Sequence, residues 1–230
     1  MNVTYIHHSC FLTETESCYY LFDYFQGSLP ALDPCKPIWV LASHKHQDHY
    51  QPAVFSILKE MGMQCIYAVL SRDIPSKTVP AEIPCTVVSA NKRYELPQGQ
   101  ALFTYRSTDQ GVAFLIQDGQ QFFYHAGDLN DWVWAEETDS YNHQMTGNYR
   151  KQISLLSEQL SGHSLTAAFV VLDPRQEQDY DRGLLYFLQH IPCDRVYPMH
   201  YWEKPEIIDR FLQEHPQYQN RIMRTEHAHF

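Results

Sequence analysis

The spacing of apolar positions predicts a chain in which strands and helices alternate. Residues 3–6 and 18–24 are rich in Tyr, Phe and Leu and flank the polar segment 13–17, which predicts strand, turn and strand. A β-hairpin or meander is therefore expected to open the fold. The continuous apolar run 38–42 is typical of a strand buried on both faces. Apolar residues recur with helical spacing over residues 53–61 and predict an amphipathic helix.

The rest of the chain continues this alternation. The sequence Asp118-Gly119 separates two apolar runs and is a strong hairpin signal, so the middle of the chain is expected to be mostly antiparallel sheet. We find no linker, low-complexity tract or short repeat, and we expect one mixed α/β domain over residues 1–230 with two sheets and outer helices. The further predicted strands are 65–70, 87–88, 101–105, 112–116, 121–124, 167–172 and 195–198, and the further predicted helices are 149–160, 184–188 and 205–213.

The charge balance narrows the range of partners. The 230 residues contain 17 Lys and Arg against 27 Asp and Glu, a net charge of −10, which disfavours nucleic acid and anionic membranes as partners. The longest wholly apolar run, 167–172, is too short to span a bilayer, and no signal peptide is evident. We expect a cytoplasmic protein that acts on a small molecule, and its oligomeric state stays open. Six cysteines without a Cys-x-x-Cys pair indicate reduced thiols.

One loop concentrates side chains that bind metals. His44, His46, Asp48 and His49 place three imidazoles and a carboxylate within six residues, directly after the apolar run 38–42. In a tight loop the first two imidazoles can converge on one cation while the aspartate and the last imidazole turn to a second. Neutral imidazole and carboxylate oxygen are the ligands that borderline divalent metals prefer. The alternative is a solvated polar loop.

Two later segments repeat the order of strand, sharp turn and metal-binding side chain. Asp128 follows the predicted strand 121–124, and His200 follows the predicted strand 195–198. A carboxylate such as Asp128 can bridge two cations about 3.5–4 Å apart. Taken alone, Asp128 has an alternative interpretation as an ordinary turn residue after Gly127.

These motifs resemble the metallo-β-lactamase superfamily. The His-x-His-x-Asp-His loop, Gly127-Asp128 and Pro198-Met199-His200 carry the resemblance. The opening segments 8–11 and 21–23 are similar to the Gly-His-Ser-x-Phe and Leu-Ile-Asp-Pro segments of its lactonase-like and phospholipase-like members. The likeness runs from about residue 3 to residue 202. It implies an αββα sandwich with metals at one sheet edge, and hydrolysis of an ester, lactone, amide or phosphodiester by a metal-activated hydroxide.

The resemblance also implies the roles of the ligands. It implies two divalent ions, with zinc as the first expectation, and it implies that Asp48 can act as a proton shuttle and Asp128 as the bridge. The implied ligands are His44 and His46 for the first metal, and Asp48, His49 and His200 for the second.

One ligand of the superfamily is missing from this sequence. The superfamily supplies a third histidine to the first metal, but residues 50–124 contain no histidine. Asp109 is our candidate substitute, with an ordinary turn carboxylate as the equal alternative, and His125 is a weaker candidate. A more oxygen-rich site would favour manganese or iron over zinc.

Several neighbours of these motifs are further candidates. His8, Asp23 and His125 are candidates for orienting ligands through hydrogen bonds, or are ordinary core residues. Trp132, Trp134 and Trp202 can wall a substrate pocket or belong to the core, and Arg175 can hold an anionic group or be a surface residue. The pattern around Cys10 does not support a thiol nucleophile. His227 and His229 are expected to lie in a solvated tail.

These observations predict a metal-dependent hydrolase of a small molecule. Two alternatives remain. A phosphodiesterase or nuclease of the same superfamily is disfavoured by the net charge of −10. A non-hydrolytic metal protein, such as a redox or sensing diiron module, is suggested by the missing histidine.

Overall fold

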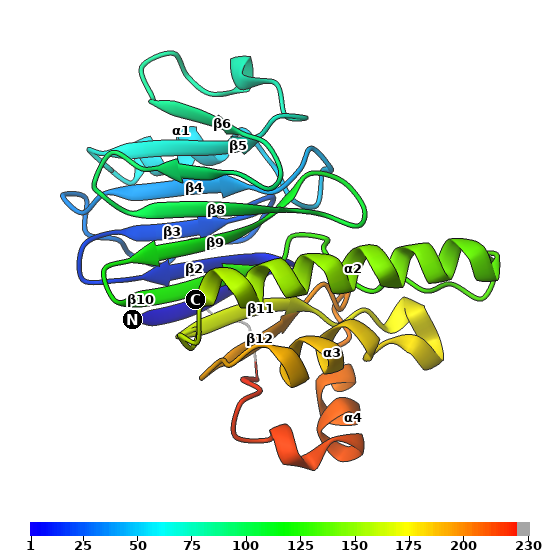
Figure 1. Cartoon of the computed structure of the whole chain (residues 1–230). Coiled ribbons are helices and arrows are strands. Elements are labelled where there is room, and N and C mark those ends of the chain that lie inside the picture. Colours follow the sequence, from blue (N-terminus) through cyan, green and yellow to red (C-terminus); the bar gives the residue numbers. More distant parts are fainter. Residues whose placement is uncertain (225–230) are drawn as a thin grey trace. The chain divides into compact units, whose positions relative to one another are not determined.

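The structure is a computed structural model that describes residues 1–224, and it divides the chain into two compact units (Figure 1). The first comprises residues 1–89 and the second residues 90–224. His227 and His229 lie outside the described residues. Each unit contains a six-stranded mixed sheet with helices, which agrees with the two sheets expected from the sequence.

The sheet of the first unit has strands in the same order as the sequence. The first two pairs, β1–β2 and β2–β3, are antiparallel, and the strands from β3 to β6 are parallel. The carboxyl ends of β3 and β4 therefore lie at one edge, where Asp23 and the His44 loop begin. The strands are β1 (Asn2–His7), β2 (Cys10–Glu14), β3 (Tyr19–Phe22), β4 (Ile38–Ala42), β5 (Ile66–Ser71) and β6 (Cys85–Val88).

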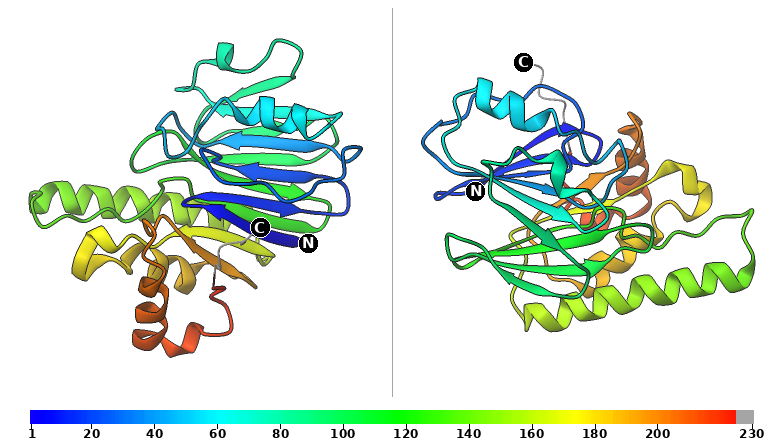
Figure 2. Two further views of the ribbon diagram at one scale, coloured as in Figure 1. Left: turned by 180° about the vertical axis from the view of Figure 1, so that it is seen from behind. Right: turned by 90° about the horizontal axis from the view of Figure 1, so that it is seen from above.

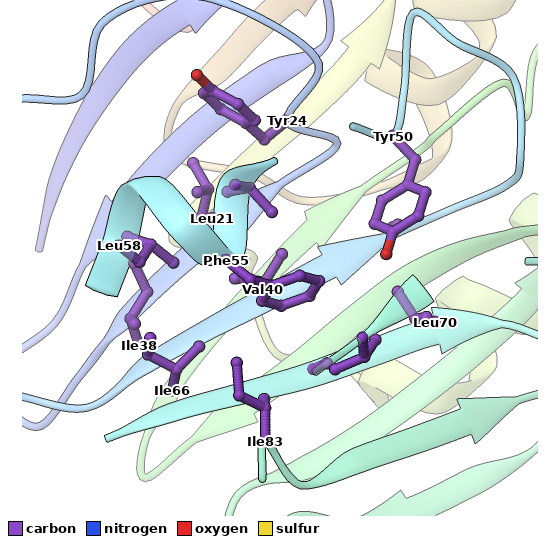
Figure 3. Close-up of a cluster of buried hydrophobic side chains, with 14 of the residues drawn as sticks. Leu21, Tyr24, Ile38, Val40, Tyr50, Phe55, Leu58, Ile66, Leu70 and Ile83 are labelled. Atoms are coloured by element: carbon purple, nitrogen blue, oxygen red, sulfur yellow. The ribbon is translucent and has the colours of Figure 1, made fainter. Parts of the chain in front are cut away.

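Helix α1 (Val54–Glu60) covers one face of this sheet and forms a hydrophobic core with it (Figures 2 and 3). Its apolar stripe buries Phe55 and Leu58, which share a cluster with Leu21 and Val40. All five residues of β4 are buried, as predicted for a strand covered on both faces. This packing anchors the strand that precedes the His44 loop.

The sheet of the second unit combines antiparallel and parallel pairs in the order β12-β11-β10-β9-β8-β7. Strands β7 to β10 form antiparallel pairs, while β10, β11 and β12 run parallel. The turn between β9 and β10 contains Gly119 at φ +58°, as the Asp-Gly signal predicted. The strands are β7 (Arg93–Glu95), β8 (Ala101–Arg106), β9 (Val112–Asp118), β10 (Gln121–His125), β11 (Ala167–Val171) and β12 (Val196–Met199).

Helices α2 (Asp139–Leu160), α3 (Arg182–His190) and α4 (Glu206–Glu214) belong to the second unit. Helix α3 packs on this sheet, because Tyr124 on β10 stacks on Phe187 of α3 with ring centroids 5.6 Å apart. Short 3-10 helices complete the described elements, and they are Ser76–Thr78 in the first unit, and Pro174–Asp179 and Pro216–Tyr218 in the second.

Three elements differ from the sequence-based expectation. Residues Cys10–Glu14 form β2, so the polar segment 13–17 is not wholly a turn and the opening is a three-stranded meander. Helix α2 begins at Asp139, ten residues before the predicted start at 149. Strand β7 was not predicted. All six cysteines are free in the structure. None of the described helices is long and apolar enough to cross a membrane.

Candidate metal centre

The loop that follows β4 folds so that its metal-binding side chains converge. The backbone N–H groups of His49 and Tyr50 both donate to the carbonyl of His46, each at 3.1 Å, which curls the loop into a single turn. The ring of His44 then lies 4.6 Å from that of His46 and 4.2 Å from that of His49. The structure thus brings the three predicted imidazoles together, with His44 and His49 fully buried.

Asp23 organises this loop from the end of β3. Its buried carboxylate accepts hydrogen bonds from Ser43 N, from Ser43 Oγ and from His49 Nδ1, at 2.7, 2.7 and 2.8 Å. Because Ser43 Oγ gives its single proton to Asp23, it accepts from His44 Nδ1 at 2.9 Å. Both neutral imidazoles are therefore protonated on Nδ1, and their lone pairs lie on Nε2. That is the tautomer a metal ligand requires.

Asp48 and His8 extend the cluster of the first unit. Oδ2 of Asp48 lies 3.4 Å from His8 Nε2 and 3.7 Å from His49 Nε2. Burial alone would raise the pKa of Asp48, but the hydrogen bond from His8 and the electrostatic interaction with His49 outweigh burial and lower it well below the usual range. His8 Nε2 thus lies beside a candidate ligand, and its role in orienting ligands stays a prediction.

Asp128 follows β10 through a tight turn. Gly127 adopts φ +52°, and its N–H donates to His125 Nδ1 at 3.1 Å. Trp132 Nε1 donates to the backbone carbonyl of Asp128 at 2.9 Å, so the indole fixes the backbone at this position. Asp128 is buried, and this turn holds it in one orientation.

Asp109 lies close to Asp128, although the two are far apart in sequence. Thr108 Oγ1 donates to the carbonyl of Asn130 at 2.6 Å and accepts from its N–H at 3.0 Å, which ties the β8–β9 loop to the turn after β10. One carboxylate oxygen of Asp109 comes within 4.8 Å of one of Asp128. Asp109 is exposed and lies in the bend between β8 and β9, and its role as a metal ligand stays a prediction.

His200 at the end of β12 is oriented by Asp173, a residue that the sequence analysis did not select. Asp173 is fully buried, and its Oδ2 accepts from His200 Nδ1 at 2.9 Å. The lone pair of the neutral ring is again on Nε2, which lies 3.4 Å from Asp128 Oδ1. Burial alone would raise the pKa of Asp173, but the hydrogen bonds from His200 and Arg175 outweigh burial and lower it to about 2.

Three of the four substrate candidates, Trp132, Arg175 and Trp202, lie near His200 or its partner Asp173. Arg175 donates to Asp173 through Nε at 2.9 Å and lies over the Trp202 ring, with 4.7 Å from its Cζ to the ring centroid. Trp202 also donates through Nε1 to Asp173 at 3.3 Å, and its side chain is 40% exposed. Trp132 stacks on Trp134, and its ring lies 5.8 Å from that of His200.

Backbone strain is concentrated at this corner. His200 and Trp202 have φ of +67° and +49°, a conformation that costs bulky side chains free energy. Asp173 accepts a hydrogen bond from each of them, so one buried carboxylate holds the strained turn closed.

One of the predicted residues, His125, lies apart from the candidate ligands. His125 is fully buried against Phe169, uses Nδ1 as an acceptor, and belongs to none of the groups of three or more candidate ligands among the described residues.

Burial raises the pKa of the Cys10 thiol well above its ordinary value, and the nearby Asp23 adds to this effect. A raised pKa agrees with the expectation that Cys10 is not a nucleophile.

Comparison with solved structures identifies the fold. The chain is similar to Igni18, a metallo hydrolase from Ignicoccus hospitalis, with a TM-score of 0.66 and 17% identity over 98% of this chain and 94% of that one. It is also similar to CmlA, a diiron beta-hydroxylase from Streptomyces venezuelae, with a TM-score of 0.63 and 11% identity over 98% of this chain and 52% of CmlA. Isothiocyanate hydrolase from Delia radicum gut bacteria aligns with a TM-score of 0.58 and 11% identity, over 97% of this chain and 95% of that one. These likenesses confirm the predicted metallo-β-lactamase fold class.

The family follows from the sequence itself. The sequence model of the beta-lactamase superfamily domain matches residues 2–143, which is more than half of the chain. The chain therefore belongs to this superfamily, as the motif resemblance indicated. No sequence among the curated proteins matches it.

Proposed function

We propose that this protein is a metal-dependent hydrolase that acts on a small-molecule ester, lactone, amide or phosphoester. The observation that carries the proposal is the shared tautomer of three buried histidines. His44, His49 and His200 each engage Nδ1 with a hydroxyl or carboxylate acceptor, so each presents the lone pair of Nε2. Carboxylates within 4 Å of two of these Nε2 atoms complete a donor set that suits a divalent metal. Membership of the superfamily supports the same proposal.

The ligand assignment rests on the resemblance together with this donor set. A pair of bound divalent metals would supply Lewis acidity and lower the pKa of a water molecule toward neutrality. Within the proposed centre Asp23 and Asp173 hold the imidazole rings, and Asp48 is placed to accept and return a proton. The proposed ligands are His44, His46 and Asp109 for one metal, Asp48, His49 and His200 for the other, and Asp128 for both.

A second candidate function is oxidative chemistry at two iron ions. It is favoured by the proximity of the Asp109 and Asp128 carboxylates, because oxygen-rich sites suit iron and manganese better than zinc. CmlA, one of the similar structures, is a diiron beta-hydroxylase, and this chain spans about half of its length.

Metal analysis combined with a substrate panel tests the proposal. The protein is expressed without added zinc, its metal content and absorption spectrum are measured, and metal-loaded protein is assayed with lactones, phosphoesters and acyl amides. We expect about two metals per chain and hydrolysis of at least one class. Coloured iron without hydrolysis favours the second candidate, and a protein that binds no divalent metal contradicts both.

Substitutions assign the ligands. We expect His49→Ala and Asp128→Ala each to abolish hydrolysis while the circular dichroism spectrum stays unchanged. Asp109→Ala is expected to lower the occupancy of one metal only. Unchanged turnover in His49→Ala or Asp128→Ala contradicts the mechanism, and normal metal content in Asp109→Ala places the substitute ligand elsewhere.

A further inference from the structure

A polar cavity in the second unit lies against α2 and the β8–β9 loop. Its volume is about 500 Å³, within the range of pockets that hold small molecules. Charged and amide side chains from separate segments line it, together with the hydroxyls of the loop. The side chains that carry the argument are Asn91, Arg106, Gln144, Asn148, Lys151 and Gln152.

The charge of the lining is opposite to that of the protein. No carboxylate lines the cavity, in a chain whose net charge is −10. Arg106 and Lys151 form no ion pair with any residue from 1 to 224. Two cations that face one cavity without a counter-charge create a positive potential there, which favours an anion.

Gln152 offers a hydrogen-bond donor, its side-chain NH₂ group, to the same cavity. Its Oε1 accepts from the backbone N–H of Arg106 at 3.0 Å, and Oδ1 of Asn91 accepts from the same N–H at 3.3 Å. Because an N–H can only donate, the atoms that face it must be the amide oxygens. Gln152 is 5% exposed, and within the described residues its NH₂ group has no hydrogen-bond partner.

We propose that this cavity binds the phosphate group of a small phosphorylated molecule. A tetrahedral oxyanion needs several donors from different directions, and the guanidinium, ammonium and amide NH₂ groups of the lining supply them. The cavity has room for more than the phosphate, which is why a phosphorylated molecule fits better than an inorganic ion alone. The proposal is independent of metal binding, because none of the lining residues named here is a proposed metal ligand.

Calorimetric titration with ribose 5-phosphate, inorganic phosphate and ribose tests the proposal. It is carried out on the protein as purified and after metal removal, because phosphate also binds metals. We expect one saturable site for ribose 5-phosphate that survives metal removal and weakens with added salt, weaker binding of inorganic phosphate, and no binding of ribose.

Two variants localise the site. Gln152→Glu is isosteric and keeps the acceptor for Arg106 N–H, but it replaces the NH₂ donor by a carboxylate oxygen. Lys151→Glu changes an exposed residue and carries little risk for folding. We expect each to weaken ribose 5-phosphate binding at least about tenfold, the loss of one charge-assisted hydrogen bond. Lys77→Ala removes an exposed lysine of the first unit and is expected to leave binding unchanged.

Three outcomes would overturn the proposal. The first is an absence of ribose 5-phosphate binding, and the second is unchanged affinity in both Gln152→Glu and Lys151→Glu. The third is tighter binding of a single-stranded RNA, lost in the same two variants, which would assign the cavity to nucleic acid. Thermal unfolding of each variant separates a loss of binding from a loss of fold.

Discussion

At the scale of single residues, two buried aspartates hold the candidate centre in place. Asp23 at the end of β3 and Asp173 after β11 each accept the Nδ1 proton of a histidine, His49 or His200. Asp173 also accepts hydrogen bonds from Arg175 and Trp202, so this one carboxylate links three residues around the candidate centre. Such acceptors fix the ring orientation and tautomer of metal-binding histidines.

Replacement of Asp173 by Asn tests this role. The amide can still accept from His200, but it loses the charge that holds the ring and the Arg175 guanidinium. We expect Asp173→Asn to bind the second metal about 10- to 100-fold more weakly, as measured by competition with a chromophoric chelator. Asp179→Asn, at the end of the 3-10 helix that Asp173 precedes, is the control, since within the described residues the carboxylate of Asp179 pairs with the half-exposed Arg182. An unchanged metal affinity in Asp173→Asn would remove Asp173 from the centre.

The acid stability of the protein provides a second test of Asp173. Its pKa is about 2 in the fold against 3.8 ordinarily, so its carboxylate stabilises the fold above about pH 4 and this contribution is lost as the pH falls toward 2. The difference corresponds to about 2 kcal/mol. We expect the difference in unfolding free energy between metal-free wild type and Asp173→Asn to shrink by about this amount between pH 5 and pH 2, measured by urea unfolding. A difference that does not change with pH contradicts the assignment.

The residues that were predicted from the sequence and the one that was missed differ in how far along the chain their partners lie. The loop around His44 was found because its candidate ligands lie next to one another in the chain. Asp173 was missed because an Asp-Pro pair after a strand is also typical of an ordinary turn. Its partner His200 is 27 residues away, and only the parallel pairing of β11 and β12 brings them together.

At the scale of elements, apolar periodicity predicted those strands and helices that bury a face. Helix α2 is the instructive exception, because its buried residues begin only at Tyr149 and its first turns are polar. Thr138 caps the start of the helix, since its Oγ1 accepts from Tyr141 N at 3.2 Å, and this residue was not used to predict the helix from the sequence. Strand β2 was missed for a different reason. Four of its five residues are buried, so it shows no alternation of buried and exposed positions.

Helix α3 approaches the turn after β10 so closely that only glycine fits. A Cβ on Gly183 would lie 1.8 Å from Oδ1 of Asn130 and 3.2 Å from the backbone N of Asp131. Asn130 cannot move aside, because it is buried and donates to Gln176 at 2.7 Å. We expect Gly183→Ala to destabilise the fold by about 2 kcal/mol, measured by urea unfolding, and to loosen the turn that carries Asp128.

Gly147 is the matched control for this substitution. It also lies in a helix, α2, but a Cβ there would meet nothing within 4 Å. Because alanine favours the helix over glycine, Gly147→Ala is expected to stabilise the fold by up to about 1 kcal/mol. If both variants were more stable than the wild type, helix propensity rather than the close approach at Gly183 would dominate.

At the scale of the whole molecule, the motifs of the sequence revealed the superfamily, whereas the net charge did not reveal where cationic side chains gather. Membership of the superfamily was evident from ligand motifs spread over residues 44–200. The net charge of −10 describes the chain as a whole, but it gives no indication of the cavity beside α2 that is lined by cationic side chains. A sum over residues cannot show where charges collect, because Arg106 and Lys151 become neighbours only through the packing of α2 on β8.

Metal removal tests the proposed centre at this scale. Since the proposed ligands come from segments distributed over most of the chain, an unfolded chain has no preformed site, and metal binding stabilises only the folded state. At a free metal concentration a thousandfold above Kd this stabilisation is about 4 kcal/mol. We expect a chelator to lower the midpoint of thermal unfolding of the wild type and to have little effect on His49→Ala. His143→Ala, which changes an exposed histidine of α2, should respond to the chelator as the wild type does. A wild-type midpoint that the chelator leaves unchanged, or a His49→Ala variant that keeps the full response, would show that these histidines do not hold a metal.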